Sequence, residues 1–180
     1  MLSLDSVSRR GMLLALGAGS VTLGSGRQAL ADPVFAEYPF QLGIAAGDPA
    51  PDGFVIWTRL APRPLEIGHG MPSAPVPVKW EVATDRGFSS VARSGEAIAR
   101  PELGHAVHVE ITGLEPGRDY FYRFTAGSER TPSGRAKTAP AAGAAVARAR
   151  FGVLGCQAYE QGFYTAHRKA AAEDFDFVYC

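Results

Sequence analysis

Cys156 is the residue whose type and position most clearly suggest chemistry in this sequence, and it lies in the stretch FGVLGCQAYEQG (residues 151–162). A short apolar run precedes it and a polar turn follows it, as at the carboxyl end of a strand in an open α/β sheet, where ligands bind. A thiolate there can act as a nucleophile or as a metal ligand. No histidine flanks Cys156 closely, which weakens the nucleophile interpretation. Spacing alone leaves three interpretations open: a buried structural cysteine, a metal ligand, and a disulfide partner of Cys180.

The other polar side chains form weaker candidates. His105 and His108 resemble a metal pair, but residues three apart on a strand point to opposite faces, so we expect exposed, solvated side chains. Asp48 and Asp52 lie in GDPAPDG, which favours a turn with Asx caps over a cation site. We expect His167 to be a packing or surface residue of a helix. The sequence has no phosphate-binding loop, no G-x-S-x-G and no zinc spacing, so we assign no catalytic residue.

The segment from residue 40 to 125 must supply most of the fold, because apolar and polar residues alternate there between turn residues. The predicted inward faces are Phe54, Ile56 and Leu60; Val76, Val78, Trp80 and Val82; Val107, Val109 and Ile111; Tyr120, Tyr122 and Phe124. Short alternating strands of this kind predict an antiparallel β-sandwich, which we place at residues 32–130. GLEPGRDYFY (113–122) resembles the loop and strand of a fibronectin type III or immunoglobulin-like domain with a tyrosine corner.

The next segment, residues 131–150, is rich in Ala, Pro and Gly and has no aromatic residue. It offers little surface to bury, so we interpret it as a linker. A weak helix over residues 141–149 is the alternative for its second half.

After the linker the hydrophobic period changes. An apolar strand over 151–155 is followed by a helical pattern over 162–173, with Phe163, Ala166 and Ala170 on one stripe, and by a second strand over 175–180. This predicts one βαβ unit at residues 151–180. Two parallel strands leave most of their apolar faces uncovered, so we expect a chain truncated just as an α/β domain begins. The predicted fold class is therefore mainly β, a sandwich followed by one βαβ unit.

The start of the chain has the pattern of an export signal. Ser8 and the pair Arg9 and Arg10 open S-R-R-x-x-L-L, and residues 12–23 then run apolar without a charge. That run is too short and too rich in Gly and Ala to cross a hydrocarbon core of roughly 30 Å. We expect a twin-arginine signal over residues 1–31, no stable membrane anchor, and a periplasmic or secreted protein. A short amphipathic helix is the alternative, but it would leave the arginine pair unexplained.

Ala29 and Ala31 supply the small-x-small cleavage pattern, so the mature chain is predicted to begin at Asp32. Cleavage would leave 149 residues with 15 basic and 17 acidic side chains, a net charge of −2. A charge of that size does not recruit nucleic acid or a membrane surface. Two cysteines allow at most one internal disulfide, which excludes a disulfide scaffold.

Three separated motifs, in order, resemble the alkaline phosphatase D (PhoD-like) family. They are FQLGIAAGDPAPDGFVIWTRLAP (40–62), HVEITGLEPGRDYFYRF (108–124) and FGVLGCQAYEQGFYTAHRKAAAEDFDFVYC (151–180). The resemblance implies hydrolysis of phosphate mono- and diesters outside the cytoplasm by a calcineurin-like metallophosphatase domain that uses iron and calcium. It also implies that Cys156, in the C-Q-x-Y-E-Q-G motif, is an iron ligand, and a soft thiolate suits iron better than calcium. The twin-arginine export machinery would then be a partner.

The chain departs from that pattern at its end, because it stops where the family continues into a G-D-x-x-Y-E motif that supplies a metal-binding aspartate. We therefore expect an N-terminal fragment of a phosphatase, inactive by itself. The alternative is a complete secreted fibronectin-like binding module without catalysis. A cysteine-based redox protein would need a second thiol at close spacing, which the sequence lacks.

Overall fold

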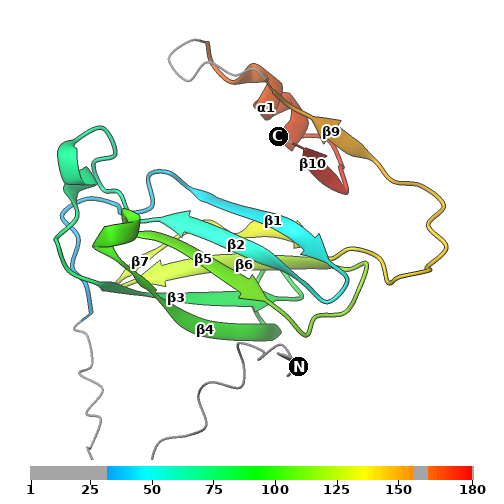
Figure 1. Ribbon diagram of the computed structural model, residues 1–180, viewed down its shortest axis with the longest axis horizontal. Helices are drawn as coiled ribbons and strands as arrows, with labels where there is room; N and C mark the ends of the chain where they lie inside the picture. Colours follow the sequence, from blue (N-terminus) through cyan, green and yellow to red (C-terminus); the bar gives the residue numbers. More distant parts are fainter. Residues whose placement is uncertain (1–31, 156–161, 180) are drawn as a thin grey trace, which may run out of the picture.

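The structure is a computed structural model that describes residues 32–155 and 162–179. Two antiparallel sheets face each other, and a smaller strand–helix–strand segment lies apart from them at the end of the chain (Figure 1). The first sheet has the order β1-β2-β5, formed by Ile44–Ala50, Gly53–Arg59 and Ala106–Ile111.

The second sheet has the order β4-β3-β6-β7, and β8 also pairs with β6. Its strands are β3 (Val76–Ala83), β4 (Val91–Ala99), β6 (Asp119–Ala126), β7 (Glu129–Arg130) and β8 (Gly134–Lys137). Short 3-10 turns at Ile67–Gly70 and Pro101–Leu103 precede β3 and β5. This strand order is that of a fibronectin-like sandwich, in which the chain changes sheet between β2 and β3, β4 and β5, and β5 and β6.

The core lies between the two sheets and consists of the side chains that the period-two pattern placed inward. The members of this core that are at most 3% exposed include Phe54, Ile56, Leu60, Val78, Val82, Val107, Ile111, Tyr120, Tyr122 and Phe124. Trp80 and Val109 pack against it and are partly buried. The sequence-based faces of all four strands are therefore confirmed. Thr58 joins the inward face, and its hydroxyl donates to the Gly43 carbonyl oxygen at 2.9 Å.

A tyrosine corner fixes the turn that enters β6. The Tyr120 ring is buried, and its hydroxyl oxygen accepts a hydrogen bond from the backbone N–H of Glu115 at 2.9 Å. Leu114 is buried beside it, and its own N–H donates to the Asp52 carbonyl in the β1–β2 turn. The tyrosine corner that the sequence predicted is therefore present in the connection between the two sheets.

The predicted linker differs from the structure in its first half, because residues 131–138 complete the sandwich. The Thr131 hydroxyl accepts from the Phe124 N–H at 3.0 Å, and β8 pairs with β6 from Gly134 to Lys137. Thr138 is buried and its hydroxyl donates to the Glu115 carbonyl at 2.7 Å. This stretch contains no large apolar residue, so the alternating apolar pattern does not reveal that it forms a strand.

Gly134 shows why this last strand needs a residue without a side chain. A Cβ atom there would lie 2.5 Å from a ring carbon of Tyr122, closer than carbon atoms can approach. Residues 141–149, where a weak helix was the alternative, contain only a turn closed by the Ala144 N–H and the Ala141 carbonyl.

The end of the chain forms the expected parallel pair with a connecting helix. The strands β9 (Phe151–Val153) and β10 (Phe177–Tyr179) pair in parallel, and α1 (Thr165–Ala171) connects them. Phe151 and Phe177 stack with ring centroids 5.4 Å apart. The βαβ prediction is confirmed, but the helix is shorter than expected. Phe163 precedes it and is 85% exposed, so the predicted apolar stripe does not form.

The tyrosine corner leads to a matched pair of substitutions. Tyr120→Phe removes the acceptor of the Glu115 N–H, so we expect a loss of about 1–3 kcal/mol in the free energy of unfolding. Tyr122→Phe is the control, because Tyr122 is equally buried on the same strand but its hydroxyl bonds to none of the described residues. Urea unfolding followed by tryptophan fluorescence measures both. Equal losses in the two variants would show that the corner bond contributes nothing.

Burial also makes Tyr122 sensitive to alkaline pH. Desolvation raises the pKa of Tyr122 to about 12, above the ordinary tyrosine value of 10.0. Between these values the unfolded chain has lost the proton and the folded chain has kept it, so stability falls as pH rises. We expect the wild-type chain to lose about 1 kcal/mol more than Tyr122→Phe between pH 9 and pH 11. The measurement is the urea midpoint at both pH values, and parallel losses would contradict it.

Candidate functional site

The candidate site is the edge at which β9 and β10 both end. Because the two strands are parallel, their carboxyl ends meet at one edge, with Val153 opposite Tyr179. The Leu154 N–H donates to the Tyr179 carbonyl at 2.9 Å and extends the pairing past the strand end. In the sequence Cys156 follows two residues after Leu154, and Cys180 follows Tyr179. Both cysteines lie outside the described residues, so the ligand role of Cys156 remains a prediction.

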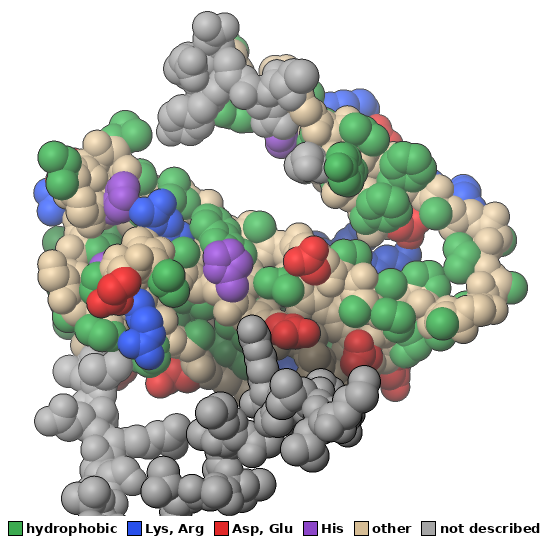
Figure 2. Space-filling view, in the orientation of Figure 1, with side chains coloured by type: hydrophobic (Ala, Val, Ile, Leu, Met, Phe, Trp, Pro, Cys, Tyr) green, Lys and Arg blue, Asp and Glu red, His purple; other side chains and the backbone are tan. Residues whose placement is uncertain are grey.

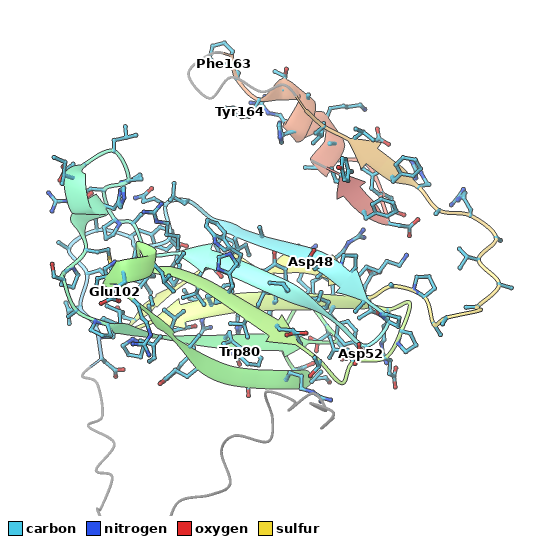
Figure 3. All side chains as sticks on the ribbon, viewed as in Figure 1. Asp48, Asp52, Trp80, Glu102, Phe163 and Tyr164 are labelled. Carbon is cyan, nitrogen blue, oxygen red and sulfur yellow. The ribbon has the colours of Figure 1, made fainter. Side chains whose placement is uncertain are left out.

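The chain returns to the described part at Gly162 and leads into α1 through Phe163 and Tyr164 (Figure 3). Tyr164 adopts a left-handed conformation with φ of 50°, which starts the helix with a sharp change of direction. Its ring meets the His167 ring edge-on, with centroids 5.4 Å apart. His167 is thus partly buried against Tyr164, which is itself 41% exposed, in agreement with the expected packing or surface residue.

Exposed apolar side chains cover one face of the β9–β10 pair. The side chains on this face are 47–70% exposed and belong to Phe151, Val153, Phe177 and Tyr179. Figure 2 shows hydrophobic side chains grouped on the segment that β9, α1 and β10 form. Two parallel strands alone leave such apolar faces uncovered.

The histidine prediction was half right. His108 is exposed on β5 beside Trp57, as expected, with ring centroids 6.4 Å apart. His105 is only 6% exposed, which contradicts the prediction. It precedes β5 with φ of 57°, so it lies off the strand, and its ring Nε2 contacts the Ala74 carbonyl oxygen at 3.1 Å. The rule for faces of a strand does not apply to a residue in the turn before it.

Asp48 and Asp52 lie apart along the β1–β2 hairpin (Figure 3). The expected turn is present, and Asp48 has φ of 48° at a register shift between Gly47 and Ala50. Neither carboxylate accepts a hydrogen bond from the rest of the described chain, so the expected Asx caps are absent. The turn follows from backbone conformation instead.

No group of three or more His, Cys, Asp or Glu side chains converges within residues 32–155 and 162–179. The described residues therefore do not supply a ligand set for iron or calcium, and no catalytic step can be assigned to such ions here. In the same ranges, no helix is both long enough and apolar enough to cross a membrane. Arg9, Arg10, Ala29 and Ala31, the predicted export and cleavage residues, lie outside the described residues.

The fold and the edge together describe a mainly β protein whose fibronectin-like sandwich is followed by a strand–helix–strand segment. Comparison with known families gives a match to the PhoD-like phosphatase, N-terminal domain, over residues 27–140. The chain belongs to the PhoD-like phosphatase family. The matched range includes β8, in agreement with its place in the sandwich.

A curated relative is alkaline phosphatase D of Bacillus subtilis (strain 168), which is 52% identical over 149 residues. That match covers 83% of this chain but 25% of the relative, so the chain spans about a quarter of the length of that protein. A solved structure described as the structure of PhoD superimposes with a TM-score of 0.79 at 53% identity, over 81% of this chain and 28% of that one. A fibronectin type III domain of human collagen alpha-1(XX) chain gives a TM-score of 0.35 at 20% identity, too low to add to the fold assignment.

Sequence reasoning missed the contacts that join the two parts of the chain. Lys137 on β8 pairs with Asp176, and Arg135 pairs with Asp174. These side chains are about 40 residues apart in the sequence. Only the folded path of the chain brings them together.

Proposed function

We propose that the whole protein hydrolyses phosphate mono- or diesters, and that this chain contributes the N-terminal sandwich and the first strand, helix and strand of its metallophosphatase domain. The observation that carries the proposal is the 52% identity to an alkaline phosphatase D over 149 residues, which extends beyond the family's N-terminal domain. The parallel β9–β10 pair with its open apolar face supports the second part.

Cys156 is the residue that we propose as a metal ligand, in the form of a thiolate bound to iron. Its place in the sequence after the carboxyl end of β9 supports this role, because ligands of open α/β sheets bind beyond that edge. Iron and calcium, when bound, would orient the phosphate and polarise it. This chain's contribution would be a rigid strand end that carries the thiolate.

Export by the twin-arginine machinery belongs to the same proposal. Arg9 and Arg10 supply the recognition pair, and Ala29 and Ala31 supply the cleavage pattern, so the enzyme would act in the periplasm or outside the cell. A protein that loads a metal in the cytoplasm has a reason to be exported in the folded state.

A purified chain of residues 32–180 is expected to hydrolyse no phosphate ester. The physical reason is that its described residues bring together no set of metal ligands. The measurement is release of nitrophenol from p-nitrophenyl phosphate and bis-p-nitrophenyl phosphate, with and without added ferric iron and calcium. Metal-dependent turnover by this chain would contradict the expectation.

The ligand role is tested in the protein translated from the complete gene. Cys156→Ser is expected to lower both the bound iron and the rate of ester hydrolysis by roughly tenfold or more, because even residues that only support metal ligands cost that much. Cys180→Ser, which also removes one thiol, is the control and should retain both. Iron is measured by mass spectrometry of the metal and hydrolysis by nitrophenol release. Iron binding unchanged in Cys156→Ser would refute the assignment.

A second candidate function is binding by the sandwich without catalysis. The observation in its favour is the ordered turn around Ile67–Gly70, where Leu65 and Ile67 are 86% and 105% exposed. Internal bonds hold this turn, including the Arg63–Glu66 ion pair at 2.9 Å and the His69 Nδ1 contact to the Pro64 carbonyl. Absence of any hydrolysis by the protein of the complete gene would favour this candidate.

A further inference from the structure

The last strand of the sandwich contacts the α/β segment through two basic side chains. Lys137 Nζ forms a close ion pair with Asp176 Oδ1. Arg135 Nη1 lies 3.3 Å from Asp174 Oδ1, and its Nη2 donates to the Phe175 carbonyl oxygen at 3.1 Å. Three consecutive residues before β10 are therefore held by alternate residues of β8, whose side chains point to the same face of the sheet.

Asp176 joins three parts of the chain. Its Oδ2 accepts a hydrogen bond from the Arg150 backbone N–H at 2.8 Å, and its own N–H donates to the Arg150 carbonyl at 2.8 Å. Arg150 directly precedes β9, and Asp176 directly precedes β10. One carboxylate thus connects the starts of both parallel strands to Lys137 of the sandwich.

Partial burial gives this contact more weight than a pair in open solvent. The side chains of Lys137 and Asp176 are 34% and 33% exposed, whereas Asp174 is 79% exposed. Hydrogen bonds from the Arg150 N–H and from Lys137 lower the pKa of Asp176, so it is charged at neutral pH. An exposed ion pair is screened by solvent and contributes little. We therefore assign most of the docking free energy to the Lys137–Asp176 pair and less to the Arg135–Asp174 pair.

The connecting residues cannot fix the arrangement by themselves. Residues 140–149 are almost all exposed, and their small Ala and Pro side chains line one wall of a cavity of about 650 Å³. Lys137, Asp176 and Phe177 lie on the lining of the same cavity. A linker of this composition connects the sandwich to the α/β segment, but it provides few packing contacts that would hold the two parts in one orientation.

We propose that Asp176 is a positioning residue: through Lys137 it fixes the α/β segment in one orientation on β8 of the sandwich. The N-terminal domain is then a scaffold that orients the strand ends, in addition to being a folded neighbour. The contacts of Asp176 all lie between described residues, so this role is independent of the phosphatase activity proposed above.

The test measures the orientation of the two parts in solution, in the chain of residues 32–180. Residual dipolar couplings of backbone amides are fitted separately for residues 40–138 and 150–179. The variants are Lys137→Met, Asp176→Asn and the double substitution. Lys79→Met is the matched control, because Lys79 is an exposed lysine on β3 of the same sheet.

We expect one alignment tensor to fit both parts of the wild-type chain and of Lys79→Met. In Lys137→Met the ratio of undocked to docked segment should rise about two- to fivefold, the range for a partly exposed ion pair. The alignment of residues 150–179 should then fall relative to the sandwich. Asp176→Asn should have a larger effect, and the double variant no more than Asp176→Asn, because both changes break one contact.

Two results of the alignment measurement would overturn the proposal. The first is separate tensors, or no measurable alignment of residues 150–179, in the wild-type chain. The second is a Lys137→Met chain that aligns like Lys79→Met. Tryptophan fluorescence in urea separates positioning from stability, since the sandwich midpoint should be the same in Lys137→Met and Lys79→Met. A midpoint lowered only in Lys137→Met would assign Lys137 a structural role and also contradict the proposal.

Discussion

The packing of β6 against the opposite sheet is the interaction on which the other features depend. Tyr120, Tyr122 and Phe124 are buried from this strand, and it pairs with β3 on one side and with β7 and β8 on the other. Aromatic side chains bury large apolar areas, so these three positions contribute much of the surface buried between the sheets. Because β8 pairs with this strand, the backbone that carries Arg135 and Lys137 is held in place.

The N-terminal domain can therefore orient the segment that follows it, which is a structural role in a family named for its phosphatase activity. The segment that follows it is small, has one open apolar face, and has few contacts of its own. A segment of that kind has no preferred orientation unless a neighbour supplies one. The contact of Asp176 with Lys137 and with the Arg150 N–H supplies it at the starts of both strands, at the end opposite to the edge where Cys156 follows in the sequence.

For the candidate site, only the strand end that precedes Cys156 could be predicted from the sequence. An apolar run that ends in Gly-Cys indicated a strand end, and the parallel β9–β10 pair agrees with it. The identity of the family came from motifs, and the comparisons confirm it. A set of metal ligands could not be predicted in this way. Ligands from separate strands converge only through the fold and leave no recognisable spacing in the sequence.

The sandwich could be predicted from the sequence alone, since alternation with period two and the GLEPGRDYFY stretch record which side chains face the core. The βαβ unit was predicted from the change of hydrophobic period after residue 150. Tertiary structure decided what local pattern does not encode. His105 is buried because it lies in a turn before β5, and residues 134–137 form a strand because their backbone pairs with β6. Tertiary structure also brought Lys137 to Asp176. Contacts between charged residues far apart in the chain have no period, and only the folded backbone sets the distance between them.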